Sequence, residues 1–217
     1  MTIKTGFGNR LAVLTAVATM TLVAPAVWAQ KAQQKAGEDI QGFRAGMVGI
    51  RAQIDTTLEA LNGVVQSANG GDPKSAFKKY SDQIKNMDKQ IEKTRSYRQK
   101  MQEQGQAYFK EWEAKMGAVT NEELKAKAAA RRTELQAQYE KISASVAQAK
   151  DDSAKFWQDL QDLQKYYASD LSPAGISGTA EMVAKASADG KTVQGYIDQA
   201  VAAVDKVMSE MGIVAKT

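Results

Sequence analysis

The chain has 217 residues with a formal net charge of +4, and it contains no cysteine and no histidine. These two absences exclude disulfides, thiol nucleophiles, imidazole bases and the commonest zinc ligands. Only three prolines, in a composition rich in Ala, Gln, Lys and Glu, predict an all-α fold. Because no glycine-rich phosphate loop is present either, we expect a protein with no cofactor and no enzymatic activity.

Residues 1–29 have the three parts of a signal peptide. Lys4 and Arg10 supply positive charge, residues 11–23 form an apolar core, and Val27-Trp28-Ala29 places small residues before a cleavage site. The apolar core is shorter than the roughly 20 residues that a membrane-spanning helix needs. The sequence therefore predicts a cleaved signal peptide, and an uncleaved membrane anchor is the alternative.

Cleavage leaves a mature chain, residues 30–217, that begins at Gln30 and has no lipid-accepting cysteine. The removed segment carries two basic and no acidic residues, so the formal charge falls from +4 to +2. Such a small positive charge gives no footprint for nucleic-acid binding. We therefore expect one exported helical domain that is soluble in the periplasm and has no transmembrane segment.

The first helix of the mature chain is predicted to begin near residue 38, after a polar lead-in over residues 30–37. Its seam follows a heptad repeat, at Ile40, Phe43, Met47, Ile50, Ile54, Thr57, Leu61 and Val64. Gly42, Gly46 and Gly49 lie beside this seam and would let a neighbouring backbone approach closely. They indicate either a tight crossing with another helix of the chain or a face for self-association.

Two long helices that fold back on each other are predicted between Pro73 and Asp170, with a turn at residues 117–120. Their apolar residues recur every 3.5 residues on average, which is typical of a left-handed coiled coil. The first arm carries this seam at Phe77, Tyr80, Ile84, Met87, Ile91, Thr94, Arg98, Met101, Gly105, Tyr108 and Trp112. The second arm carries it at Leu135, Tyr139, Ile142, Val146, Ala149, Ser153, Phe156, Leu160, Leu163 and Tyr167. Arg98 at a seam position is interpreted as a device that fixes the register at a cost in stability.

Turn and capping residues delimit these helices. Segment 69–73 combines two glycines, which can end a helix, with Asp72, which can cap the next one, and a proline that fits its first position. Thr120 and Glu123 form a predicted capping box at the start of the second arm. A third break, at residues 171–178, precedes the final helix.

Short connections make consecutive helices antiparallel neighbours. The turn positions therefore predict a four-helix antiparallel bundle built from residues 38–101 and 139–212. Residues 102–138 would project from it as a long two-stranded coiled-coil hairpin. Folding the chain about residue 119 places Phe109 opposite Ala129.

Large side chains gather near the tip of the predicted hairpin, at Tyr108, Phe109, Trp112 and Met116. Because a two-stranded arm buries little surface, we expect these side chains to remain partly exposed and to be candidate partner-binding residues. The alternative is that they only pack against the alanines of the opposite arm.

Charge is unevenly distributed between the two arms. Residues 74–100 include nine basic and three acidic residues, whereas residues 150–170 include three lysines and five aspartates. This pattern indicates either charge complementarity between the arms or a basic stripe that makes weak contact with an anionic surface.

Four stretches carry a resemblance to a known family. Segments 108–113 (Tyr-Phe-Lys-Glu-Trp-Glu), 121–124 (Asn-Glu-Glu-Leu), 156–163 and 170–176 resemble a bacterial family catalogued as domain of unknown function 2959. The resemblance covers about residues 77–211. It implies an exported coiled-coil protein, and it supplies no activity and no functional residues.

These features favour a structural or interaction protein of the cell envelope, which binds an envelope protein or a second copy of itself. An ATP-independent holdase-type chaperone of the periplasm is the alternative, because nine methionines and a projecting hairpin are compatible with client binding. A holdase needs exposed apolar surface to hold unfolded clients, so the extent of that surface discriminates between the two classes.

Overall fold

The structure, a computed structural model, describes residues 23–148 and 150–213. Every regular element in these ranges is a helix, which confirms the all-α class. The helices are α1 (Val23–Ser67), α2 (Pro73–Gly117), α3 (Glu122–Gln148), α4 (Lys150–Ser169), α5 (Pro173–Ser177) and α6 (Ala180–Glu210). Residues 1–22 of the predicted signal peptide lie outside the described residues.

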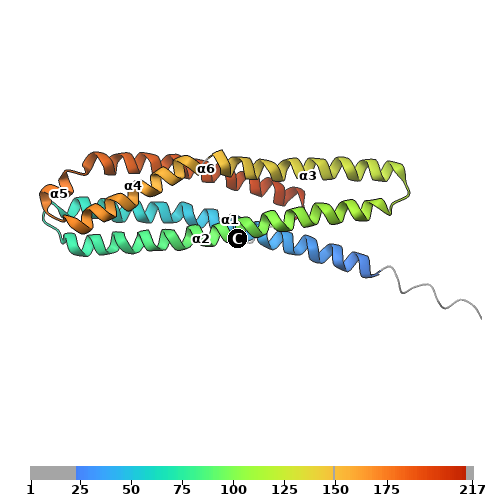
Figure 1. Cartoon of the computed structure of the whole chain (residues 1–217), viewed down its shortest axis with the longest axis horizontal. Helices are drawn as coiled ribbons and strands as arrows, with labels where there is room; N and C mark the ends of the chain where they lie inside the picture. Colours follow the sequence, from blue (N-terminus) through green and yellow to red (C-terminus); the bar gives the residue numbers. More distant parts are fainter. Residues whose placement is uncertain (1–22, 149, 214–217) are drawn as a thin grey trace, which may run out of the picture.

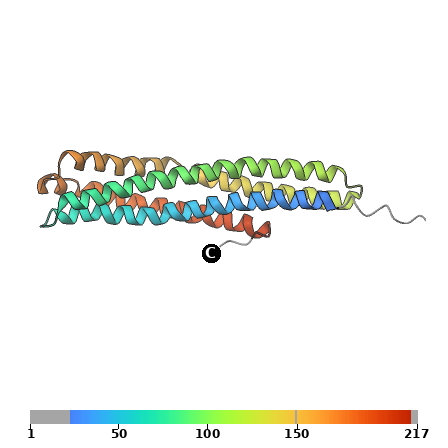
Figure 2. The same cartoon turned by 90° about the horizontal axis from the view of Figure 1, so that it is seen from below.

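The molecule is elongated, and its long helices run lengthwise (Figure 1). The α1–α2 turn and α5 lie at one end, which we call the base, and the α2–α3 turn lies at the other end, the tip. The view turned by 90° shows α2 and α3 extending past the end of α6 toward the tip (Figure 2). The axis of α4 is inclined to that of α3 (Figure 1), and residue 149 between them lies outside the described residues.

The first helix begins earlier than its periodicity indicated. Residues 30–37, predicted as a polar lead-in, belong to α1, which starts at Val23. This segment is rich in Ala, Gln and Lys, which are strong helix formers. Backbone propensity therefore extends the helix where an apolar seam is absent.

The first predicted helix boundary has the expected chemistry, and the third lies where it was predicted. Gly70 adopts a φ of 115° after α1, a conformation that glycine takes without strain. The Asp72 side chain caps α2 by accepting hydrogen bonds from the amides of Lys74 and Ser75, at 3.1 and 3.2 Å. The third break contains the short helix α5, whose cap is the hydroxyl of Ser172.

The predicted capping box at the start of α3 is wrong. Asn121, one residue after Thr120, is the cap, because its Oδ1 accepts from the amide of Leu124 at 3.0 Å. Glu123 forms an ion pair with Lys127 at 2.7 Å. Asparagine caps helices at least as well as threonine does, so the helix begins at the later of two competent residues.

Glycines bring α1 and α2 close together. A Cβ atom added to Gly42 would lie 2.5 Å from the Tyr97 ring, and one added to Gly46 would lie 2.6 Å from the hydroxyl oxygen of Thr94. The side-chain amide of Gln90 uses this proximity to donate to the carbonyl of Gly46 at 3.1 Å. These glycines therefore form a tight crossing within the chain, which decides between the two interpretations of their spacing.

Two hydrophobic clusters form the core. The cluster at the base joins α1, α2, α4, α5 and α6 around Tyr80 and Tyr167, whose ring centroids lie 6.4 Å apart. A second cluster, nearer the middle, joins the four helices α1, α2, α3 and α6 around Ile40, Met101, Ile142, Val204 and Met208. Burial of apolar surface in these clusters is the main force holding the helices together, since the chain contains no disulfide.

Candidate functional site

The candidate partner-binding residues lie on the last three turns of α2. Tyr108, Phe109, Trp112 and Met116 are all half-buried, neither in the core nor fully exposed. The ring centroids of Tyr108 and Trp112, one turn apart on α2, are 5.7 Å apart, and those of Tyr108 and Phe109 are 5.4 Å apart. Three of the four residues therefore form one aromatic group, and their role in binding stays a prediction.

Phe109 makes a contact that the predicted pairing with Ala129 did not include. The Phe109 ring lies against that of Tyr139, at 6.0 Å between centroids, and Tyr139 itself occupies the space above Gly105. The Tyr139 hydroxyl donates to the carbonyl of Met101. Helical side chains lean toward the N-terminus of their own helix, so in an antiparallel pair Phe109 and Tyr139 lean toward each other. Pairing residues at equal distances from the turn compares the positions of their Cα atoms along the helices. It does not include the direction in which the side chains point.

Charged groups surround the aromatic group on the α3 side. Arg132 forms an ion pair with Glu113 across the hairpin at 2.9 Å, and Arg131 donates to the backbone carbonyl of Glu210 at 2.6 Å. The last turn of α6 therefore touches α3 at Arg131. This contact lies nearer the tip than residue 139, where the boundary between the bundle and the projecting hairpin was predicted. Burial raises the pKa of the Tyr108 hydroxyl, and the positive charge of Arg131 partly offsets that rise.

Three polar atoms at this end are buried without a hydrogen-bond partner in the part of the chain that the structure describes. They are the indole nitrogen of Trp112, Nε of Arg132 and one carboxylate oxygen of Glu210. An unsatisfied buried polar group costs about 1–3 kcal/mol. The Glu210 oxygen still lies 4.0 Å from the guanidinium of Arg131, so the indole of Trp112 and Nε of Arg132 are the less favourable of the three.

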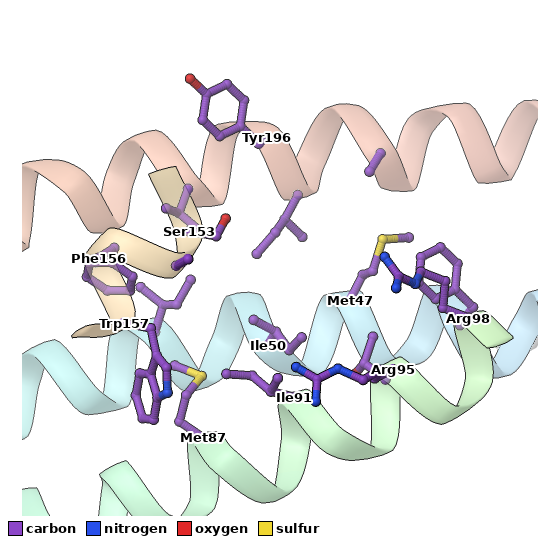
Figure 3. A pocket seen from close by; sticks show the side chains of 17 residues that line it. Met47, Ile50, Met87, Ile91, Arg95, Arg98, Ser153, Phe156, Trp157 and Tyr196 are labelled. Carbon is purple, nitrogen blue, oxygen red and sulfur yellow. The ribbon is translucent and has the colours of Figure 1, made fainter. Parts of the chain in front are cut away.

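A second candidate site, which was not predicted, lies between helices of the bundle and is partly open to solvent. It is a cavity of about 430 Å³ between α1, α2, α4 and α6 (Figure 3). Most of its described lining is apolar: Phe43, Met47, Ile50, Ile54, Met87, Ile91, Ala154, Phe156, Trp157, Val193, Ile197 and Ala200. The polar residues among the lining are Thr94, Arg95, Arg98, Ser153 and Tyr196.

The arginines of the cavity both come from α2. Arg95 forms an ion pair with Glu92 on its own helix. Arg98 is half-buried and has no ion-pair or hydrogen-bond partner among the described residues. In Figure 3 its guanidinium lies beside Met47 at one end of the cavity, whereas Phe156 and Trp157 lie at the other end.

The sequence held a signal for this cavity. Arg98 and Ser153 both occupy predicted seam positions, where a continuous coiled coil carries large apolar residues. A polar or small side chain at a seam position fills less of the space between helices than a large apolar one does. Both residues line the cavity, Ser153 from α4 and Arg98 from α2.

The basic stretch of α2 does not pair with α4. Its ion pairs stay within α2, Lys85 with Asp82 and Arg95 with Glu92, and none joins residues 74–100 to the described part of α4. Direct ion pairs between these two helices therefore do not account for the uneven charge. The lysines of residues 74–100 are exposed, whereas Arg98 is half-buried.

The described ranges offer no metal site and no membrane-spanning helix. No group of three or more acidic, histidine or cysteine side chains there could hold a metal ion. No helix in those ranges is long and apolar enough to cross a membrane.

Residues 34–211 match a family described as protein of unknown function, DUF2959. The chain belongs to this family. The DUF2959 match begins in α1 and ends just after α6, so it extends further toward the N-terminus than the resemblance indicated and includes both the hairpin tip and the cavity. No curated protein and no solved structure matches the chain.

Proposed function

We propose that this DUF2959 protein is an exported, periplasmic protein of the cell envelope that acts by binding a partner protein, without catalysis. In this proposal a four-helix base supports the α2–α3 pair, which serves as a coiled-coil arm. The observation that carries the proposal is the half-buried aromatic group of Tyr108, Phe109 and Trp112, placed where α2 and α3 pass the end of α6 (Figure 1).

Such a group is suited to binding a protein. Tyrosine and tryptophan are enriched among residues that dominate the energy of interfaces, because they bury a large area and lose little conformational freedom. Leu124, exposed at 56%, adds an apolar side chain across the turn.

The distribution of exposed apolar residues favours an interaction protein over a holdase. In the described part of the chain the large exposed apolar side chains are Val48, Leu124, Tyr166 and Met182, which lie on four different helices. Scattered single residues are ordinary on protein surfaces, whereas client binding needs a contiguous patch. A weak contact of the basic α2 surface with anionic lipid headgroups is compatible with either class and would fade as salt rises.

A photo-crosslinking phenylalanine derivative placed at Leu124 tests the site. The matched control carries the same group at Met182, which is exposed at 48% and lies near the base. In intact cells we expect a discrete crosslinked partner from position 124 only, and its loss when Trp112→Ala is added. Identical adducts from both positions, or adducts that survive Trp112→Ala, contradict the proposal.

Export is tested separately by the mass of the protein recovered from the periplasm. We expect a chain that begins at Gln30. A recovered chain that still contains residues 11–23 would show that the leader is not removed.

A further inference from the structure

The cavity of Figure 3 has the composition of a ligand site rather than of a packing defect. Its volume of about 430 Å³ falls in the range of small-molecule sites, roughly 300–1,000 Å³. Such sites are lined mainly by apolar side chains, with a few polar groups that fix the orientation of the ligand. Four helices contribute apolar side chains here, and the two charged groups of the described lining stand on one of them.

The apolar part of the lining selects an apolar occupant. Methionine and isoleucine from α1 and α2 face phenylalanine and tryptophan from α4 across the cavity. A cavity with such walls offers water few hydrogen-bond partners, so an apolar chain gains more than water does by filling it. The cavity lies along the bundle between long helices, which suits an extended chain.

The charged part of the lining selects an anion. Arg98 is half-buried without an acceptor in the described part of the chain, and Arg95 stands one turn away on the same helix. No acidic side chain is among the described lining residues. Guanidinium groups bind carboxylates and phosphates through paired hydrogen bonds, and partial burial strengthens such bonds.

We propose that this cavity binds an anionic lipid with a single acyl chain. The chain lies among Met47, Ile50 and Trp157, and the carboxylate or phosphate of the head group receives hydrogen bonds from Arg98. The exposed basic residues of α2 surround this end and favour the approach of an anion. This site is distinct from the aromatic group at the tip, so its test does not depend on the proposed partner protein.

Tryptophan fluorescence in the full chain measures the binding. The chain contains three tryptophans, and Trp28→Phe with Trp112→Phe leaves Trp157 in the cavity as the only emitter. A dibrominated stearic acid quenches tryptophan on contact, so we expect saturable quenching at one molecule per chain. The reciprocal protein, which keeps only Trp112, should show no saturable quenching.

Competition against the brominated probe then defines the ligand. Palmitate and a palmitoyl lysophosphatidylglycerol carry the same chain with a carboxylate or a phosphate, and displacement by one or both identifies the head group that the site accepts. Hexadecanol, with the chain but no charge, should compete at least tenfold less well than the better anion. Shortening the chain by two methylenes should weaken competition by roughly tenfold or more.

Point variants separate binding from folding. Arg98→Gln should weaken binding of the better anion at least tenfold while leaving the melting temperature unchanged. Lys93→Gln removes the same charge from an exposed position of α2 that does not line the cavity, and it should bind as the parent does. Ala200→Met fills the cavity with a flexible side chain and should abolish saturable quenching.

Three results would overturn the proposal: no saturable quenching of Trp157, equal quenching of the Trp112 protein, or competition by hexadecanol as strong as that of the anions. An unchanged affinity in Arg98→Gln would equally remove the head-group assignment on which the proposal depends.

Discussion

The two ends of α2 place similar residues in different surroundings. Tyr80, near the base, is fully buried in a cluster to which five helices contribute, and its hydroxyl donates to the carbonyl of Leu160 at 2.7 Å. Tyr108 and Trp112, near the tip, continue the same seam but remain half-buried. A heptad repeat specifies which side of a helix meets its partner, and the number of further neighbours decides how deeply that side is buried.

Buried polar atoms differ between the two ends only in degree. At the base the hydroxyls of Tyr167 and Thr179 share a hydrogen bond of 2.6 Å, although the hydroxyl of Ser81 is buried without a partner in the described part of the chain. At the tip the indole nitrogen of Trp112 and Nε of Arg132 are buried without a hydrogen-bond partner there. Because each such atom lowers stability, we expect the tip to gain less from its polar groups than the base does.

The largest expected effect is that of Ile142→Asp. Ile142 is fully buried where α1, α2, α3 and α6 meet, so the variant places a carboxylate among apolar side chains without a partner. We expect the free energy of unfolding to fall by about 3–5 kcal/mol in urea melts.

Lys127→Asp is the matched control on the same helix, near the tip. The Lys127 side chain is 71% exposed, and Glu123 is its one ion-pair partner among the described residues. Its replacement should change the free energy of unfolding by less than about 1 kcal/mol. Equal losses in the two variants would show that the base and the tip do not differ in burial.

Replacing either of two glycines in α1 by alanine should change the stability less, and the two changes should have opposite signs. Gly46→Ala would press a methyl group against the buried Thr94 side chain and should destabilise the protein by about 1–3 kcal/mol. Gly63→Ala meets nothing within 4 Å and should stabilise the helix by about 0.5–1 kcal/mol. Thermal melts of both variants check this, and a loss at Gly63 would contradict the assignment of the crossing to Gly46.

The sequence predicted the features that depend on local chemistry and periodicity. The buried seam residues Tyr80, Ile142 and Leu160, the Asp72 cap and the glycine-mediated approach of two helices all follow from spacing and residue type. These signals are complete within a few turns of one helix, so they need no knowledge of the rest of the fold.

Features that depend on side-chain direction or on gaps between helices were not predictable in this way. Tyr139 reaches Phe109 because both side chains lean along their helices, which a count of residues ignores. The cavity arises where Arg98 and Ser153 interrupt apolar seams on different helices. Neither residue indicates a cavity alone, because the gap exists only after the helices are assembled.

Alkaline pH should weaken the base through its buried tyrosines. Burial raises the pKa of Tyr80 well above its ordinary value of 10.0, so the unfolded chain releases this proton at a lower pH than the folded one does. The free energy of unfolding is therefore unaffected by this group below pH 10. Above pH 10 it falls by up to about 1.4 kcal/mol per pH unit for each such tyrosine, because only the unfolded chain has lost the proton. Urea melts at pH 8, 10 and 11 should show a shallower decline for Tyr80→Phe than for the parent, and parallel curves would contradict the burial argument.

The smallest expected effect is that of Trp112→Phe at the tip. We compare it with Tyr80→Phe at the base, which also removes a polar atom from an aromatic side chain. At neutral pH Tyr80→Phe removes a hydroxyl that has a partner and should cost about 1 kcal/mol. Trp112→Phe removes some apolar area but also an indole nitrogen that is buried without a partner, and the two contributions oppose each other. We therefore expect the free energy of unfolding to change by less than about 0.5 kcal/mol, measured in parallel urea melts of the two variants. A loss at Trp112 as large as that at Tyr80 would place the indole in the core, whereas an unchanged stability with weaker capture of the partner would separate binding from folding at one side chain.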